Sequence, residues 1–342
     1  MSNDGILILG SNEVDSLLAG RETEVIEIVE SAYVAHQRGE SSLPHSTFLR
    51  FPGDDTNRII ALPAFLGDGF DVAGMKWISS FPGNVRQGME RASAVLILNS
   101  RATGRPETIL EGSIISARRT AASAAAAARV LLAARTPERV GLVGTGVINL
   151  EVARSLRAAL PAVHRFLLFD LDAARAGRFA ASLREILGEV EVAIAGSLDE
   201  LLAASPLVSF ATTALRPYVS DLSACVPGAV LLHVSLRDLT PEAILACDNV
   251  VDDPDHVCRA QTSVHLAEQA TGGRDFIRCT LADILQGAAP ARRGDGSIAV
   301  FSPFGLGVLD IAVGARVAGW AREAGRGTFI PSFLPAGQGE TV

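Results

Sequence analysis

The chain has 342 residues, of which 48% are hydrophobic and 20% are charged, and its formal net charge at pH 7 is −8. A chain of this length and composition can bury two hydrophobic cores, so we expect two folded domains and no extensive disorder. Its acidic balance, without long blocks of like charge, argues against nucleic acid or an anionic membrane surface as a partner and favours a small molecule.

The first 120 residues are predicted to form helices followed by a mainly antiparallel sheet. Residues 11–38 carry apolar side chains at helical spacing, with acidic residues in the first turns. Short β-branched or aromatic runs then alternate with Gly, Pro, Asp and Asn turns, which predicts strands. The predicted strands are Ser46–Phe51, Arg58–Pro63, Val72–Ser79 and Ala92–Asn99. Residues 100–106 are predicted to form a hairpin turn.

From Val140 the pattern becomes an alternation of strands and helices, which indicates a parallel, doubly wound sheet. The predicted strands are Val140–Val143, Phe166–Asp170, a region near Ala193, Val208–Ala211, Val230–Val234 and Asn249–Val251. A strand after residue 298 and a helix over Leu309–Glu323 complete the chain. We therefore expect an α/β fold with a Rossmann-type parallel-sheet domain over residues 121–299. The second domain is mainly antiparallel α+β, formed by residues 1–120 and 300–342 at the two chain ends.

The four cysteines lie far apart and form no C-x-x-C pair, which argues against a zinc site or a disulfide framework and suits a reducing cytoplasm. Histidines and acids between residues 252 and 265 match no standard set of metal ligands, so no metal is expected. The apolar stretch Ile6–Leu9 lacks the basic flank and cleavage site of a signal peptide. The longest apolar run, which follows Thr120, is too short to span a bilayer and is interrupted by Arg129.

A glycine-rich turn after the first strand of the parallel sheet predicts a dinucleotide site. Two glycines separated by one residue allow a tight turn and close approach of the pyrophosphate, whose charge is favoured at the following helix N-terminus. The predicted cofactor-binding residues of this turn are Gly144, Thr145, Gly146, Val147, Ile148 and Asn149. Asn149 stands where a third small residue is usual, which predicts looser packing of helix against strand.

Asp170 ends the next strand, close to the spacing at which an acid contacts the adenosine ribose hydroxyls. A carboxylate there repels a 2′-phosphate, so NAD is favoured over NADP. Asp172 is an alternative ribose ligand, whereas Arg175 or Arg178 would suit the phosphate of NADP. The alternative that Asp170 is an ordinary aspartate of a turn stays open.

Lys76 is the only lysine among 30 basic residues. Where a sequence otherwise uses arginine, a retained lysine is either an ammonium that the planar guanidinium cannot replace or a chance survivor on the surface. The composition alone does not choose between them.

Five segments of this sequence occur in the same order in a known family. They are Gly74-Met-Lys-Trp-Ile-Ser-Ser-Phe-Pro-Gly-Asn84, Arg119-Thr-Ala-Ala-Ser123, the Gly144 turn, His233-Val-Ser-Leu-Arg-Asp-Leu239 and Phe304-Gly-Leu-Gly-Val-Leu-Asp310. Over nearly its whole length the chain resembles the ornithine cyclodeaminase/mu-crystallin superfamily. The segments 42–52, 58–63, 110–117 and 302–305 are similar to one branch, the dehydrogenases of N-(2-amino-2-carboxyethyl)-L-glutamate.

The resemblance implies a role for each matching residue. Lys76 and Arg119 correspond to the residues that hold the substrate's α-carboxylate, and Asp238 and Lys76 are the expected catalytic residues. The structural alternatives are a surface arginine for Arg119 and a loop or helix-cap aspartate for Asp238. The cofactor set is completed by Thr212, Thr213, Ser235 and Gly305.

The substrate pocket departs from the cyclodeaminase pattern. Those enzymes carry an arginine where this chain has His45, so the ornithine pocket does not transfer directly. His45 either contacts a substrate carboxylate or is structural. Arg50, Arg58 and Arg91 add positive charge to the same domain, which suits a ligand with several carboxylates better than ornithine.

The activity implied by the resemblance is NAD-dependent oxidative cleavage of N-(2-amino-2-carboxyethyl)-L-glutamate. The products would be 2-oxoglutarate, NADH and L-2,3-diaminopropionate, a building block of siderophores and peptide antibiotics. The alternatives are an ornithine or lysine cyclodeaminase, an amino acid dehydrogenase, a ketimine reductase, and a crystallin-like protein that binds NAD(P)H without turnover. By the same resemblance we expect a cytoplasmic homodimer whose dimerisation and substrate domain is the one formed by both chain ends.

Overall fold

The computed structural model describes residues 5–133, 135–294 and 296–335, in which the chain folds into two compact units. The first unit comprises Met1–Arg21, Ala35–Arg119 and Leu306–Val342, and the second comprises Glu22–Val34 and Thr120–Gly305. The chain therefore passes into the second unit twice, for Glu22–Val34 and for Thr120–Gly305, and returns to the first unit each time.

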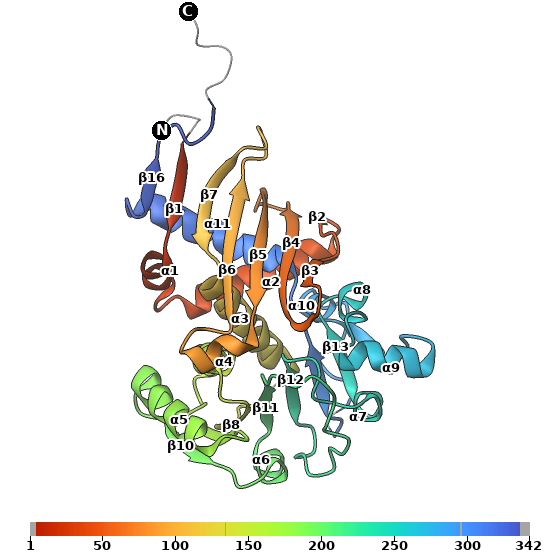
Figure 1. The fold of residues 1–342 in the computed structure, drawn as a ribbon. Coiled ribbons are helices and arrows are strands. Elements are labelled where there is room, and N and C mark those ends of the chain that lie inside the picture. Colours follow the sequence, from red (N-terminus) through yellow and green to blue (C-terminus); the bar gives the residue numbers. More distant parts are fainter. Residues whose placement is uncertain (1–4, 134, 295, 336–342) are drawn as a thin grey trace, which may run out of the picture. The chain divides into compact units, whose positions relative to one another are not determined.

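The first unit is built on an eight-stranded sheet that is mainly antiparallel (Figure 1). Its strand order is β16 (Thr328–Ile330), β1 (Ile6–Leu9), β7 (Pro106–Glu111), β6 (Ala92–Asn99), β5 (Val72–Ser80), β4 (Asp54–Leu66) and β2 (Ser41–Ser42), with β3 (Thr47–Phe51) also paired to β4. Within this sheet, only the β1–β7 pair is parallel among the described strands. The helical segments of this unit are α1 (Ser11–Leu18), the 3-10 helix η1 (Pro82–Gln87), the first half of α3 (Ser113–Leu131) and α11 (Gly307–Glu323).

Helix α11 packs on one face of this sheet, across β4, β5 and β6 (Figure 1). Two glycines permit the close approach. A Cβ on Gly314 of the helix would lie 2.1 Å from a methyl carbon of Leu96, and one on Gly74 of β5 would lie 3.2 Å from the Cγ2 atom of Ile311 on the helix. Because α11 is held tightly against β5, side chains on the two elements can meet in a buried layer.

The second unit is built on an eight-stranded sheet whose pairs are all parallel. Its order is β10 (Glu191–Ile194), β9 (Arg165–Phe169), β8 (Arg139–Val143), β11 (Leu207–Phe210), β12 (Val230–His233), β15 (Ala299–Ser302), β13 (Asp248–Val251) and β14 (Ile277–Thr280). Its helical segments are α2 (Glu22–Gln37) up to Val34, the second half of α3, α4 (Val147–Ala159), α5 (Ala173–Leu187), α6 (Leu198–Ala204), α7 (Pro241–Leu245), α8 (Pro254–Val257), α9 (Ser263–Thr271) and α10 (Leu281–Leu285).

The order of the parallel strands reverses between β8 and β11. From β8 the chain adds β9 and β10 on one side, and then returns to add β11 and β12 on the other. In open α/β sheets ligands bind at the carboxyl ends of the strands where the order reverses in this way. The expected α/β fold, with one parallel and one mainly antiparallel sheet, is confirmed.

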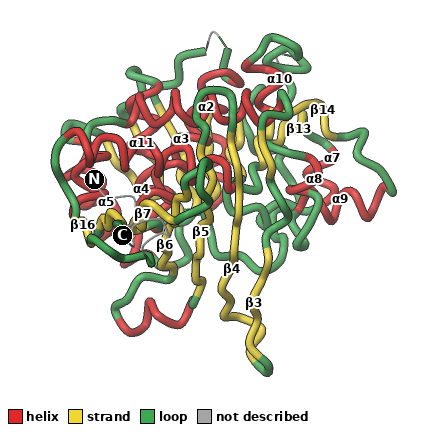
Figure 2. The backbone as a smooth tube through the Cα atoms, turned by 90° about the horizontal axis from the view of Figure 1, so that it is seen from above, coloured by secondary structure: helices red, strands yellow, loops and turns green. Residues whose placement is uncertain are grey.

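Most predicted strands lie within a residue or two of the observed ones, and Ala92–Asn99 coincides with β6. The main difference is β4, which extends to both sides of the predicted Arg58–Pro63 and forms a long hairpin with β3 (Figure 2). No strand was predicted at β1, β2, β7, β14 or β16. None of the helices in the described residues is both long and apolar enough to cross a membrane.

Candidate active site

The glycine-rich turn lies at the reversal point of the parallel sheet, between β8 and α4. Gly144 has a φ of +88°, and a Cβ there would lie 2.6 Å from the carbonyl oxygen of Ala211, at the end of β11. Glycine is therefore required for both conformation and space. Gly146 is the N-cap of α4 and carries no side chain at the helix N-terminus, where a phosphate group is favoured. These features fit the pyrophosphate of a dinucleotide.

Asn149 does not loosen the packing at this turn. Its side chain is fully buried, and its amide nitrogen donates to the carbonyl oxygens of Val143 at 2.9 Å and Gly144 at 2.6 Å. Its amide oxygen accepts a 2.7 Å hydrogen bond from Ser209. The expectation of looser packing is thus wrong, because the longer polar side chain ties the turn to both strands instead of leaving a gap. Asn149 therefore stabilises the turn from a buried position.

Asp170 holds the other side of the turn. Its Oδ2 accepts hydrogen bonds from the backbone nitrogen and hydroxyl of Thr145, at 2.8 and 2.6 Å, and its Oδ1 accepts one from the nitrogen of Asp172. Partial burial raises its pKa, but these hydrogen bonds and the charge of Arg175 outweigh the burial, so the net pKa lies below the ordinary value. Asp172 instead caps α5 by accepting from the Arg175 nitrogen.

Asp238 lies just after β12 with its side chain fully buried and surrounded by hydrogen-bond donors. Thr212 and Tyr218 hydroxyls donate to Oδ1 at 2.5 and 3.1 Å. The Ser235 hydroxyl donates to Oδ2, and Nε2 of His233 lies 3.3 Å from the same oxygen. The helix-cap alternative fails, since the N-cap of α7 is Thr240. Thr213, the neighbour of Thr212, is exposed.

This environment keeps Asp238 ionised. Burial raises its pKa, but a protonated His233 and the hydroxyls of Ser235 and Thr212 lower it further, so the net pKa lies below the ordinary value. Burial, together with the charge of Asp238, raises the pKa of Tyr218, which stays a hydrogen-bond donor. The result is a buried carboxylate at the carboxyl end of a central strand, with its position fixed from several directions.

Gly305 lies at the point where the chain passes from the second unit back to the first. It has a φ of +89°, and its backbone nitrogen donates to Asp252 Oδ2 at 2.8 Å. The nitrogen of Phe304 donates to Asp252 Oδ1 at 2.9 Å. Burial raises the pKa of Asp252 to about 6 despite these hydrogen bonds. Asp252 therefore fixes the backbone that precedes α11.

Lys76 and Arg119 come together in the first unit around a third charge, Asp310. Lys76 Nζ lies 2.7 Å from Asp310 Oδ2, and Arg119 Nε lies 2.9 Å from Oδ1. Ser116 accepts from both cations, at 3.1 Å from Lys76 and 3.4 Å from Arg119. The side chains of Lys76, Arg119 and Asp310 are 3%, 8% and 1% exposed. Lys76 and Arg119 are therefore both buried, whereas the alternative interpretations of each residue placed it on the surface.

This cluster carries a net charge of +1 when all three groups are ionised. Burial is the largest influence on Lys76 and, with the charge of Arg119, outweighs the attraction of Asp310, so its pKa falls to about 8. Burial also raises the pKa of Asp310, but Arg119 and Lys76 lower it further, and its net pKa lies below the ordinary value. A buried excess of positive charge favours an anionic ligand.

Of the remaining predicted substrate residues, Arg50 and Arg58 lie on strands of the same sheet, whereas His45 and Arg91 lie before strands β3 and β6. In the strand register Leu62 opposes Lys76, Arg58 opposes Ser80, and Arg50 opposes Arg58. Paired residues of antiparallel strands share a face, so these arginines lie on the Lys76 face, about 13 Å along the strands. The backbone carbonyl oxygen of Arg91 accepts a hydrogen bond from the backbone nitrogen of Phe81. His45, before β3, is exposed.

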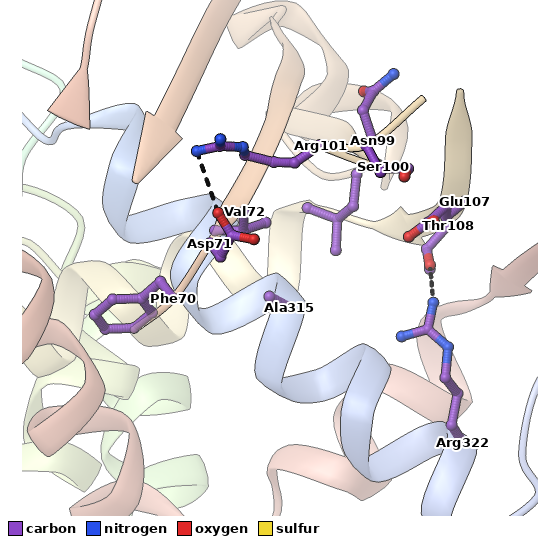
Figure 3. A pocket seen from close by; sticks show the side chains of 12 residues that line it. Phe70, Asp71, Val72, Asn99, Ser100, Arg101, Glu107, Thr108, Ala315 and Arg322 are labelled. Carbon is purple, nitrogen blue, oxygen red and sulfur yellow. Dashed lines mark hydrogen bonds and ion pairs between the residues drawn. The ribbon is translucent and has the colours of Figure 1, made fainter. Parts of the chain in front are cut away.

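A separate cavity of about 310 Å³ lies in the first unit among β5, β6, β7 and α11 (Figure 3). Within its wall, Asp71 forms an ion pair with Arg101, and Arg322 donates a hydrogen bond to Thr108. Arg322 is twelve residues beyond Asp310 on α11, or about 18 Å along the helix. The cavity is therefore distinct from the Lys76 cluster.

Sequence reasoning missed Asp310, Ser116, His233, Tyr218 and Asp252. Asp310 and His233 both lie within segments that carried the family resemblance, but nothing in the sequence showed what they contact. Among the described residues, no three His, Cys, Asp or Glu side chains gather as a metal site.

Comparison with known proteins places this geometry in context. The family model described as "Ornithine cyclodeaminase/mu-crystallin family" matches residues 7–324. The chain is 25% identical over 334 residues to the N-((2S)-2-amino-2-carboxyethyl)-L-glutamate dehydrogenase of Staphylococcus aureus, covering 96% of this chain and 99% of that protein.

Two solved structures extend the likeness to the fold. The structure of CmnK has a TM-score of 0.87 and 30% identity, covering 98% of this chain and 100% of its own. The Thermococcus litoralis Δ1-pyrroline-2-carboxylate reductase, in complex with NADH and L-proline, has a TM-score of 0.87 and 26% identity, covering 94% and 99%.

Proposed function

Because the chain belongs to the ornithine cyclodeaminase/mu-crystallin family, we propose that it is an NAD-dependent oxidoreductase that acts on the C–N bond of an amino acid. The substrate that fits best is N-(2-amino-2-carboxyethyl)-L-glutamate. Oxidation at the glutamate α-carbon gives an imine, and water cleaves it to 2-oxoglutarate and L-2,3-diaminopropionate. The balance is one substrate, one NAD⁺ and one water giving the two products, one NADH and one proton.

The buried cluster of Lys76, Arg119 and Asp310 is the observation that carries this proposal. Its two cations and one anion leave a net positive charge in a site that is almost closed to solvent. An α-carboxylate would balance that charge by accepting hydrogen bonds from Lys76 and Arg119, while Asp310 keeps both cations in place. A carboxylate anchored in this way fixes the position of the neighbouring α-carbon.

The arginines of the β3–β4 hairpin favour a substrate with more than one carboxylate. Arg58 and Arg50 lie on the same sheet face as Lys76, toward the hairpin end. The proposed substrate has three carboxylates, so after the first binds at Lys76 and Arg119, two remain for such cations. Alanine and ornithine have no further carboxylate to place there. We assign Arg91 and His45 to the same region as secondary contacts.

The second unit is proposed to bind NAD. Gly144, Thr145 and Gly146 would cradle the pyrophosphate, and Asp170 would face the adenosine ribose, where its negative charge excludes a 2′-phosphate. The proposed contacts around them are Val147, Ile148, Thr212, Thr213, Ser235 and Gly305. When bound, NAD supplies the acceptor for the hydride that leaves the substrate α-carbon.

Asp238 is the proposed proton acceptor. Its carboxylate stays ionised despite burial and is fixed by Thr212, Ser235 and Tyr218, so it can take a proton from the substrate amine as the C–N bond is oxidised. After the imine forms, the same carboxylate orients the water that attacks it.

The antiparallel sheet also supports a homodimer. On the face away from α11, Leu49, Trp77 and Val95 are 46%, 40% and 40% exposed, and Trp77 lies directly opposite Val95. A second copy would cover this apolar face. Light scattering should give twice the chain mass for the native protein and a lower mass for Val95→Asp, and a native monomer would refute the dimer. We place the protein in the cytoplasm, where its four free cysteines would stay reduced.

Absorbance at the NADH band tests the reaction. The protein and NAD⁺ are mixed in parallel with N-(2-amino-2-carboxyethyl)-L-glutamate, L-alanine and L-ornithine, and Δ1-pyrroline-2-carboxylate is mixed with NADH. NADH formed with the first substrate alone, in amounts equal to 2-oxoglutarate, supports the proposal. Proline and ammonia from ornithine without net NADH would make the protein a cyclodeaminase. NADH binding without turnover of any substrate would make it a crystallin-like binding protein.

A further inference from the structure

His233 is a fully buried titratable group to which the mechanism above gives no task. It is the last residue of β12, and its ring lies edge-on to Phe210 of β11, with ring centroids 6.3 Å apart. Nδ1 lies 3.3 Å from the hydroxyl oxygen of Ser302 on β15. Nε2 faces Asp238, five residues further along the chain. The charged group that faces this ring is the Asp238 carboxylate. Arg237, which precedes Asp238 in the chain, carries a charge that interacts with that carboxylate.

Two contacts at Nε2 make opposite demands on its proton. The backbone nitrogen of Asp238 donates to Nε2 at 3.1 Å, which requires an unprotonated nitrogen. Asp238 Oδ2 lies 3.3 Å from the same Nε2, and two acceptors that face each other at this distance repel unless one of them carries a proton. A proton arriving at Nε2 would turn that repulsion into a charge-assisted hydrogen bond.

Ser302 allows either state of the ring. With Nε2 unprotonated, the neutral ring carries its proton on Nδ1, and the imidazolium keeps that proton, so the Ser302 hydroxyl accepts a hydrogen bond from Nδ1 in both states. His233 can therefore gain a proton at Nε2 without losing its partner at Nδ1. The hydroxyl of Ser235, by contrast, has one hydrogen and two acceptors, Asp238 Oδ2 and the Phe210 carbonyl, so it cannot carry an extra proton away.

We propose that His233 is a positioning residue for Asp238 and the acceptor of the proton that Asp238 takes up in the reaction. The Oδ2–H bond breaks, the Nε2–H bond forms, and an imidazolium paired with a carboxylate results. Asp238 is thereby ionised again before the hydrolytic step, when it must orient water. The inference rests on the proposed function, in which Asp238 first accepts a proton from the substrate amine. Asp238 must then lose that proton before it can orient the water that attacks the imine.

Nitrogen NMR of the intact protein, labelled with ¹⁵N-histidine, tests the proton position without any substrate. The expected spectrum has one histidine with its proton on Nδ1 at high pH and a second, hydrogen-bonded proton on Nε2 at lower pH, and this signal is absent from His233→Gln. If that variant does not fold, Ser302→Ala identifies the signal by shifting it. An Nε2 that stays unprotonated across the range of pH in which the protein is folded would overturn the proposal.

Kinetics of His233→Gln tests the consequence. A glutamine amide can accept from the Asp238 nitrogen or donate to Oδ2, but it cannot take up a proton. We expect kcat to fall about 100-fold, one ionisation to disappear from the kcat–pH profile, and the KM for NAD⁺ to stay within about twofold. The matched control is His164→Gln, a partly exposed histidine whose ring hydrogen-bonds to the Ala162 carbonyl, far along the chain from Asp238.

An unchanged kcat and pH profile in His233→Gln would refute the inference. Failure of the proposed substrate would appear differently, as absent turnover in the native protein, with the NMR result unaffected. In that case the kinetic comparison uses whichever amino acid or imine of the panel is turned over.

Discussion

Replacing Asp310 with asparagine is expected to lower the free energy of unfolding of the first unit by about 3–5 kcal/mol. Asp310 lies 2.7 Å from Lys76 Nζ and 2.9 Å from Arg119 Nε, and all three side chains are buried. At an effective dielectric constant of about 20, each contact has a Coulomb energy of about 6 kcal/mol. Much of this attraction offsets the desolvation of the charges, but removing only the anion leaves two buried cations beside each other.

Urea unfolding followed by tryptophan fluorescence measures this loss. Both tryptophans, Trp77 and Trp320, lie in the first unit, so the signal reports on that unit. The matched control is Asp68→Asn in the same unit, which removes a carboxylate 3.2 Å from Arg38; the side chains of this pair are 40% and 56% exposed. The control should lose no more than about 1 kcal/mol, because exposed ion pairs contribute little. Equal losses in the two variants would show that the Asp310 cluster is not a buried charge network.

Three further substitutions test the assigned roles. Lys76→Arg should raise the KM of the amino acid substrate at least tenfold, because the guanidinium is larger and planar. In the native protein the KM should also rise above pH 8, since burial lowers the pKa of Lys76 to about 8 and loss of its proton removes the net positive charge of the cluster. The arginine variant should lack this rise. An identical pH dependence of the KM in both proteins would contradict the role assigned to Lys76. Asp238→Asn should lower kcat by about 10²–10⁴-fold while the Kd of NADH, measured by fluorescence titration, stays within about twofold; unchanged turnover would remove Asp238 from the mechanism. Gly144→Ala should weaken NADH binding at least tenfold in the same titration, because its Cβ would lie 2.6 Å from the Ala211 carbonyl oxygen at a φ of +88°; Gly177→Ala, in a helix with no atom within 4 Å of the added carbon, should leave binding unchanged.

The sequence predicted those features that depend on local pattern. Alternating and continuous apolar runs located the strands of both sheets, and the glycines at 144 and 146 located the turn at the reversal of the parallel sheet. Lys76 stood out as the only lysine, and its burial with Arg119 agrees with the importance given to it. Such signals lie within a few residues of one another, so they are readable without the fold.

The parts that were missed depend on contacts between distant residues. Asp310 is 234 residues from Lys76 and 191 from Arg119, and no spacing rule links them. Asn149 was expected to loosen the turn because its size departs from the usual pattern, whereas its hydrogen bond to Ser209 on a neighbouring strand makes the larger side chain fit. The proton conflict at His233 likewise arises from two short distances that only the folded chain creates.

The origin of the hydride tests the account most directly. The substrate N-(2-amino-2-carboxyethyl)-L-glutamate, with deuterium at the glutamate α-carbon, is incubated with the protein and NAD⁺, and the reduced cofactor is analysed by mass spectrometry. The proposed reaction gives one deuterium in each NADH, with 2-oxoglutarate and L-2,3-diaminopropionate formed in equal amounts. NADH without deuterium, or no NADH at all from this substrate, would contradict oxidation at that carbon.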